Sequence, residues 1–153
     1  SGALAMMSTK GFDLGQGMAI LKDSNVEKIA VANPKTAPYG MASIEALKHA
    51  NIFETVESKL VYGESISQAI QFATTAADVG FVNTSAFYGQ NMKKYTKGKE
   101  WVDVDPTLYT PIAQGIVILK KAQNNAEAKA FYDFVLSAKA KEVFKNYGYL
   151  VNE

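Results

Sequence analysis

The sequence predicts an α/β fold with a mainly parallel sheet flanked by helices. Short β-type runs alternate with stretches of helical spacing along most of the chain, which is the pattern of βαβ units. The run at residues 79–82, Val-Gly-Phe-Val, is nearly all apolar, as is typical of a parallel strand covered on both faces. Pro and Gly stand at several junctions between the predicted elements, and both residues interrupt regular structure.

The chain begins with a predicted strand over residues 3–7, an apolar run that ends in Ser-Thr-Lys-Gly, a turn-forming sequence. Residues 17–21 predict a single helical turn. A second strand is expected over residues 28–32, and it stops at Asn33-Pro34 because the residue before a proline avoids the helical conformation.

The next elements continue the alternation. Apolar spacing predicts a helix over residues 41–50, and Pro38 suits its first turn because the N–H that proline lacks would be unpaired there. Residues 59–62 predict a strand, and the helical spacing of alanines and Ile over residues 66–76 predicts the helix after it. A short helix is expected to start near Ser85, after the strand at residues 79–82.

The last third of the chain predicts two strands and two helices. Residues 101–104 alternate in polarity, as an edge strand does, and the apolar run at residues 115–119 predicts a buried strand. An amphipathic helix is expected over residues 126–136, and a further helix over residues 139–146, capped by Ser137 and ending at Tyr-Gly.

Composition narrows the functions that the chain can have. With 153 residues, 48% of them hydrophobic, one domain is the default expectation. The formal net charge of +1 provides no electrostatic footprint for nucleic acid. The absence of Cys excludes disulfides, thiolate metal sites and thiol nucleophiles. The longest apolar runs are far too short to span a bilayer.

Residues that carry catalysis are not grouped in this sequence. His49 is the only His, which makes it a poor metal ligand candidate, and Asp103 and Asp105 beside Pro106 indicate a turn rather than an acid–base pair. The sequence has no P-loop, dinucleotide fingerprint or Gly-x-Ser-x-Gly motif. We therefore expect no enzyme, no cofactor and no metal site.

Three junctions that follow predicted strands offer neutral hydrogen-bond donors. The loop before the second predicted helix places the backbone N–H groups of Tyr39 and Gly40 in a first helical turn, where they lack an intrahelical acceptor. Ser65 is a candidate N-cap that leaves N–H groups such as that of Ile66 available, and Asn83 can donate through its amide. Ligands of such sheets bind at the carboxyl ends of the strands. A small oxyanion suits donors of this kind, although each junction is also common in proteins that bind nothing there.

Several of these segments together resemble one known family. Residues 29–40, Ile-Ala-Val-Ala-Asn-Pro-Lys-Thr-Ala-Pro-Tyr-Gly, are close to the signature loop of the periplasmic molybdate-binding proteins of ABC importers. Residues 63–69, Gly-Glu-Ser-Ile-Ser-Gln-Ala, and residues 79–82 resemble the next two blocks of that family. Residues 111–119 and 128–149 resemble its C-terminal end, so the resemblance covers nearly the whole chain.

The resemblance implies a two-lobed fold that closes on a molybdate or tungstate oxyanion. It implies that Tyr39 and Ile66 donate backbone N–H groups to the ligand, while Asn83 occupies a position where some members place a Tyr hydroxyl. It further implies that the protein delivers the anion to an ABC permease of the inner membrane, and that it works in the periplasm or as a lipid-anchored extracellular protein. The bound metal oxide is then ligand rather than cofactor.

The resemblance also predicts an unusual domain organisation. Family members begin with a further segment that forms most of the first lobe, and this chain is expected to lack it. Residues 8–109 are expected to form the second lobe, whereas residues 1–7 and 110–153 are expected to be a remnant of the first. The apolar residues Phe131, Phe134, Val135 and Phe144 would then lie exposed, and such patches favour self-association.

Two further functions remain open on the sequence. The chain can be the ligand-sensing domain of a transcription regulator with the same fold, although no DNA-binding helix-turn-helix is present. It can also be a binding protein for another oxyanion, such as sulfate.

Overall fold

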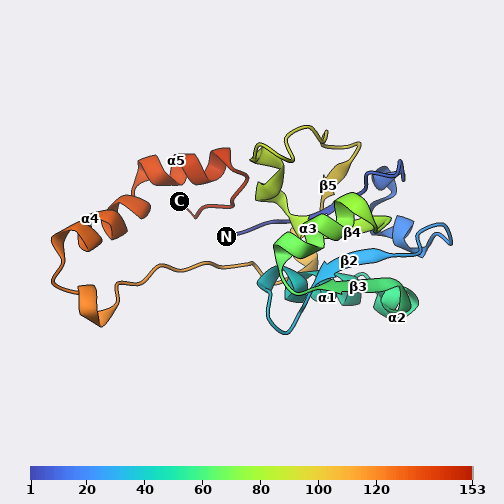
Figure 1. The fold of residues 1–153 in the computed structure, drawn as a ribbon, viewed down its shortest axis with the longest axis horizontal. Coiled ribbons are helices and arrows are strands. Elements are labelled where there is room, and N and C mark those ends of the chain that lie inside the picture. The colour runs from blue at the N-terminus through green and yellow to red at the C-terminus, as the bar shows by residue number, and fades with distance from the viewer. Residues whose placement is uncertain (153) are drawn as a thin grey trace.

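The computed structural model describes residues 1–152, which form an α/β body followed by an extended segment and two further helices (Figure 1). The strands are β1 (Leu4–Met7), β2 (Ile29–Ala32), β3 (Leu60–Gly63), β4 (Val79–Asn83) and β5 (Trp101–Asp103). The α-helices are α1 (Pro38–His49), α2 (Phe53–Val56), α3 (Ile66–Thr75), α4 (Ala126–Val135) and α5 (Ala138–Asn146). Short 3-10 helices are η1 (Leu14–Lys22), η2 (Glu57–Lys59), η3 (Thr84–Tyr88), η4 (Pro106–Leu108) and η5 (Lys120–Ala122).

The sheet has the strand order β3-β2-β4-β1-β5. Strand β2 pairs in parallel with β3 and β4, whereas β1 pairs antiparallel with both β4 and β5. The α/β fold with flanking helices is confirmed, but the expectation of a mainly parallel sheet was wrong, because two of its four pairings are antiparallel. Helices α1 and α3 lie in the crossover connections between the parallel strands β2, β3 and β4. Strands β1 and β5 are not joined to the sheet by such connections. Strand β5 is at the edge, as predicted.

Helices cover both faces of the sheet, and the strand residues alternate between two cores. On one face Leu4, Ile29 and Phe81 are fully buried with the inner side of α1. On the other face the neighbouring residues Ala5 and Ala30 pack with α3 and with Trp101. This alternation follows from the period of two in strand side chains.

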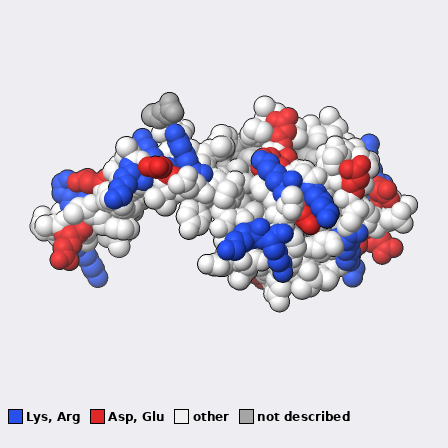
Figure 2. Space-filling view, turned by 90° about the horizontal axis from the view of Figure 1, so that it is seen from above, with Lys and Arg blue, Asp and Glu red and all other residues white. Residues whose placement is uncertain are grey.

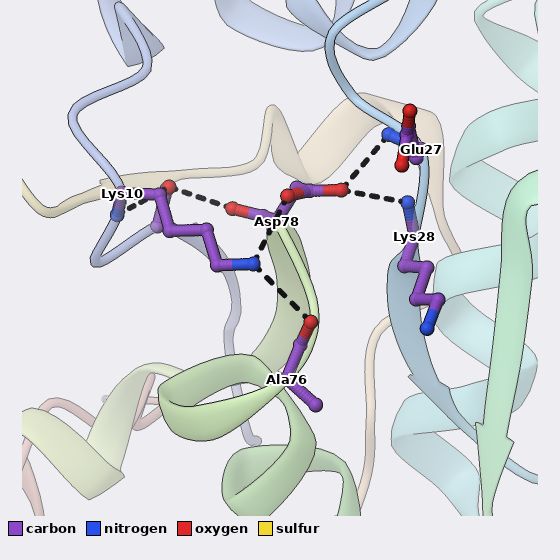
Figure 3. A network of polar contacts seen from close by, with 6 residues as sticks. Lys10, Glu27, Lys28, Ala76 and Asp78 are labelled. Carbon is purple, nitrogen blue, oxygen red and sulfur yellow. Dashed lines mark hydrogen bonds and ion pairs between the residues drawn. The ribbon is translucent and has the colours of Figure 1, made fainter.

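A polar network joins the opposite end of the sheet (Figure 3). The Oδ2 atom of Asp78 accepts hydrogen bonds from the backbone N–H groups of Glu27 at 2.9 Å and Lys28 at 2.8 Å. Its Oδ1 atom lies 3.1 Å from the ammonium of Lys10, and its carbonyl accepts from the Ser8 hydroxyl at 2.6 Å. Asp78 thereby ties the starts of β2 and β4 to the end of β1.

The pKa of Asp78 reflects this network. Burial alone raises the pKa of the carboxyl group, but the backbone N–H groups of Lys28 and Glu27 and the ammonium of Lys10 outweigh that effect. The pKa therefore lies below its usual range, because each partner stabilises the charged form.

The C-terminal part departs from the prediction in one element. Residues 115–119 are extended but form no strand among residues 1–152, so the predicted buried strand was wrong. Val117 and Leu119 are 77% and 69% exposed. A β-ladder needs a neighbouring strand to pair with, and the described residues provide none there.

Helices α4 and α5 form as predicted; the Ser137 cap of α5 was predicted, and the structure adds an Asn125 cap for α4. The Oδ1 atom of Asn125 accepts from the Ala128 N–H at 2.9 Å, and the Ser137 hydroxyl accepts from the Ala140 N–H at 3.3 Å. Yet Ala140 is the one buried residue in the two helices, and the side chains of Phe131 and Phe134 are 63% and 49% exposed. Acidic and basic side chains are scattered over both parts of the molecule (Figure 2). None of the described helices combines the length and apolarity that crossing a membrane requires.

Candidate functional site

The three predicted junctions lie side by side at the carboxyl ends of the parallel strands. Strands β3, β2 and β4 are parallel neighbours with β2 in the middle, so their carboxyl ends lie side by side. The N–H group of Asn33, just past β2, donates to the Gly63 carbonyl at the end of β3 at 2.7 Å. This bond joins the loop that leads into α1 to the loop that leads into α3.

The first junction leaves donors free at the start of α1. Asn33 closes the loop, because its Oδ1 accepts from the Lys35 N–H at 3.0 Å and its carbonyl accepts from the Ala37 N–H at 2.9 Å. Ala37 is the N-cap residue and has no side chain that accepts a hydrogen bond. Consequently the N–H groups of Tyr39 and Gly40 have no acceptor within residues 1–152.

Gly40 also sets how closely α1 approaches the sheet. A Cβ atom at this position would lie 2.1 Å from the Ala32 carbonyl oxygen and 2.9 Å from the carbonyl carbon of Asn33. Only glycine permits this contact, which holds the first turn of α1 directly against the end of β2. The free N–H groups are therefore fixed relative to the strand ends.

The second junction is capped as the sequence predicted. The Ser65 hydroxyl accepts from the Gln68 N–H at 3.2 Å, and the Gln68 side chain accepts from the Glu64 N–H at 2.6 Å. The arrangement resembles a capping box, except that Gln68 accepts from the residue before the N-cap rather than from the N-cap Ser65 itself. It uses the third N–H of the helix and leaves those of Ile66 and Ser67 without an acceptor in the described part of the chain.

The third junction carries buried polar atoms without partners. The Asn83 Nδ2 donates to the Ser85 hydroxyl at 2.7 Å, whereas the Asn83 Oδ1 and the Thr84 hydroxyl find no partner among residues 1–152. A serine hydroxyl both donates and accepts. Turning the amide of Asn83 by 180° therefore keeps the contact with Ser85 and places the free NH₂ group where Oδ1 now lies.

Thr84 is a residue that sequence reasoning did not single out. Its side chain is 5% exposed, and its N–H donates to the Ala3 carbonyl at 2.9 Å. A polar residue directly after a buried strand was the available signal, but the same pattern occurs at many strand ends with no ligand.

At the carboxyl ends of these strands, the partial positive charge comes from the helix dipoles rather than from ionised side chains. Lys35 and Glu64, the charged residues of the two loops, are both exposed. Helices α1 and α3 have 12 and 10 residues, and each N-terminus favours an anion by about 0.3–1 kcal/mol, or ~2 kcal/mol when partly buried. The arrangement can therefore hold a small anion through neutral donors.

The other candidate residues have structural partners. The Nδ1 atom of His49 lies 2.8 Å from the Leu108 carbonyl, Asp103 pairs with Lys97, and Asp105 accepts from the Thr107 N–H at 2.9 Å. Among the residues described here, no three His, Cys, Asp or Glu side chains come together as a metal site.

Comparison with known proteins identifies relatives along nearly the whole chain. The molybdate-binding protein ModA of Rhodobacter capsulatus is 41% identical over 150 residues, which cover 97% of this chain and 57% of that protein. The molybdate-binding protein ModA of Azotobacter vinelandii is 44% identical over 150 residues, which cover 97% of this chain and 58% of that protein. The chain thus spans somewhat more than half the length of these relatives.

Solved structures agree with this fold. The periplasmic molybdate-binding protein of Azotobacter vinelandii matches with a TM-score of 0.85 and 29% identity, over 99% of this chain and 66% of the solved chain. The substrate-binding domain of a molybdenum ABC transporter from Clostridium difficile matches with a TM-score of 0.73 and 27% identity, over 99% of this chain and 64% of that chain. The model of the bacterial extracellular solute-binding proteins matches residues 1–150. The chain therefore belongs to the family of bacterial extracellular solute-binding proteins.

Proposed function

We propose that this chain binds molybdate as part of the solute-binding component of an ABC importer. The observation that carries the proposal is the pair of helix N-termini at adjacent strand ends, each with two backbone N–H groups that lack an acceptor within residues 1–152. The names of the relatives and of the similar structures, which refer to molybdate or molybdenum, support the choice of anion.

The chemistry of the ligand fits these donors. Molybdate is a tetrahedral dianion with four acceptor oxygens, so it can accept from Tyr39 N–H, Ile66 N–H and the turned amide of Asn83 at once. The dianion is then held by neutral N–H donors and helix dipoles, without a cationic side chain, and helix N-termini bind anions in this way. Tungstate has nearly the same size and charge, and we expect it to bind equally well.

The proposed organisation follows the prediction from the sequence. Residues 8–109 form the second lobe of a two-lobed protein, and residues 1–7 and 110–153 belong to the first lobe. The exposure of most apolar side chains of α4 and α5 supports the assignment of residues 110–153 to another lobe. Strand β1 (Leu4–Met7), by contrast, lies within the sheet of the body between β4 and β5. Molybdate binds between the lobes, no chemistry follows, and an ABC permease in the inner membrane receives the anion from the periplasm.

Calorimetric titration with molybdate tests the proposal, with sulfate as the control anion. Because this chain is expected to hold only half of the site, we expect weak or absent binding from it alone, and the titration is repeated on a protein that spans the full length of its relatives. Saturable heat with molybdate and tungstate, and none with sulfate, supports it. Saturable binding of sulfate in place of molybdate would mean that the site serves another oxyanion. Absence of heat with all three anions, from this chain and from a protein spanning the full length of its relatives, would refute the proposal.

We further propose that the chain by itself self-associates through α4 and α5. Phe131, Phe134, Leu136, Val143 and Tyr147 are between 49% and 63% exposed, and clustered apolar surface of this kind favours contact with a second copy. Sedimentation velocity should show a concentration-dependent dimer. Replacing Phe131 and Phe134 by Ser should return the chain to a monomer, and a monomeric wild type at high concentration would refute this second proposal.

A further inference from the structure

The side chain of Tyr39 packs beside the start of β1, whose first residue, Leu4, pairs with Asn83 of the third junction. The backbone N–H of Tyr39 belongs to the first turn of α1, whereas its ring is 8% exposed and packs in the same core cluster as Leu4, Tyr109 and Ile112. Tyr39 therefore lies at the carboxyl ends of the strands through its backbone and in the region where the chain leaves the sheet body through its ring.

The Tyr39 hydroxyl lies against Gly2. A Cβ atom at residue 2 would be 2.1 Å from the hydroxyl oxygen, 2.9 Å from Cζ and 3.3 Å from Cε1. The φ angle of Gly2 is not in the left-handed region, so an alanine is excluded there by space and not by backbone conformation. Gly2 is thus a glycine because Tyr39 occupies the position of its side chain.

Three segments of the chain meet at the contact between Gly2 and Tyr39. The N–H of Gly2 donates to the Ile112 carbonyl at 2.9 Å, and Ser1 and Leu150 exchange backbone hydrogen bonds, of which the Leu150 N–H to Ser1 carbonyl bond is 2.8 Å. Figure 1 shows the N-terminus between the extended segment that leads from the sheet body to α4 and the C-terminal tail that follows α5. We define the crossing segments as residues 1–3, 110–113 and 148–150.

The electrostatics agree with this packing. Burial raises the pKa of Tyr39 to about 12, and the neighbouring phenols of Tyr149 and Tyr109 contribute to that rise. The hydroxyl group is therefore neutral at physiological pH. Tyr109 is itself bound to the first strand, because its hydroxyl accepts from the Leu4 N–H at 3.0 Å.

We infer that Tyr39 is a positioning residue that couples the crossing segments to the anion site. A shift of residue 2 relative to the sheet body presses on the Tyr39 ring. Gly40 holds the first turn of α1 against the end of β2 with no room for one further atom, so we expect the pressure to change the orientation of the Tyr39 and Gly40 N–H groups rather than the place of the helix. The inference rests on the proposed anion site.

The test measures the backbone amides of Tyr39 and Gly40 by NMR, alone and with molybdate. Gly2→Ala inserts a methyl group against the Tyr39 hydroxyl. The matched control is Gly115→Ala, because a Cβ atom at residue 115 has nothing within 4 Å and its φ is likewise outside the left-handed region. Gly2→Ala should shift both amide signals, and it should weaken molybdate binding about tenfold, the cost of one misaligned hydrogen bond to a charged ligand.

A second variant separates coupling from simple loss of stability. Tyr39→Phe removes the atom that a Cβ at residue 2 would approach most closely. In the Tyr39→Phe background, Gly2→Ala should shift the amides of residues 39 and 40 by less than half as much as in the wild type. If Gly2→Ala alone does not fold, restored folding in the double variant supports the coupling, and continued unfolding overturns it.

The outcomes distinguish this inference from the proposed function. Amide shifts from Gly2→Ala that match those from Gly115→Ala would overturn the coupling, even with tight molybdate binding. Equal shifts in the Tyr and Phe backgrounds would overturn it as well. If the wild type binds no molybdate but Gly2→Ala shifts the two amides and Tyr39→Phe suppresses that shift, the coupling stands and the proposed ligand is wrong.

Discussion

Removing one backbone N–H from the anion site is possible without changing the fold, because Ile66 is the first residue of α3. Proline is favoured at this position, where it lacks only an N–H that the helix does not use. Ser65 before it has φ −142° and ψ 167°, which is the extended conformation that a residue before proline adopts. Ile66→Pro therefore deletes one donor and keeps the cap formed by Ser65 and Gln68.

The expected loss follows from the kind of bond removed. A hydrogen bond to a charged group contributes about 1.5–3 kcal/mol, so molybdate should bind roughly 10- to 150-fold more weakly to the Ile66→Pro chain. Ile66 also packs against the buried residues Ala32, Ala37 and Ala69. Ile66→Ala is the matched control, because it removes the same contacts and keeps the N–H.

Isothermal titration calorimetry of the two variants and the wild type measures this difference. Circular dichroism should show the same helix content in all three chains. The expected result is a large loss of affinity for Ile66→Pro and a small one for Ile66→Ala. Equal affinity of the two variants would refute the role of the Ile66 N–H.

Three further predictions concern the stability of the sheet body. The pKa of Asp78 is lowered in the folded state, so its contribution to the free energy of unfolding is present above the unfolded pKa and is lost as the pH falls through the folded pKa. Urea denaturation between neutral pH and about pH 3 should show this loss of stability in the wild type and a smaller loss in Asp78→Asn. Gly80→Ala places a Cβ atom 2.3 Å from the Cβ of Ala73 and should destabilise the chain by about 1–3 kcal/mol, an effect that Ala73→Gly should partly reverse; an unchanged midpoint of unfolding would contradict the packing of α3 on β4. Ser65→Ala removes the hydroxyl that accepts from the Gln68 N–H and should cost about 1 kcal/mol by the same assay, whereas Ser65→Asp should keep most of the stability.

Much of the site was predictable because its signals are local. Asn33-Pro34 ends a strand, Pro38 begins a helix, and Ser65 caps the next helix through the Gln68 N–H, each within a few residues of sequence. Local chemistry of this kind determines which N–H groups a helix leaves unused. Whether Tyr39, Ile66 and Asn83 all contact one ligand stays a prediction, which the titrations above address.

The errors arose where a second segment decides the structure. Residues 115–119 have the composition of a buried strand, yet a strand exists only when another strand supplies its hydrogen bonds. The direction of β1 could not be predicted either, because the apolar run Leu4–Met7 packs as well antiparallel to β4 as parallel to it. Thr84 and the unpartnered Oδ1 of Asn83 emerged only from their surroundings.

By itself the sequence determined most of the order of strands and helices, apart from the short helix α2 and the false strand at residues 115–119, together with the caps at Ser65 and Ser137 and the type of donor at each strand end. These features depend on residues close together in the chain. Only the tertiary structure decided the mixed direction of the sheet and the contact between Gly2 and the Tyr39 hydroxyl. Gly2 and Tyr39 lie 37 positions apart, and no local pattern shows that a glycine at one leaves room for a phenol at the other. The physical reason is that packing depends on which surfaces meet in space, and that information is absent from any short stretch of sequence.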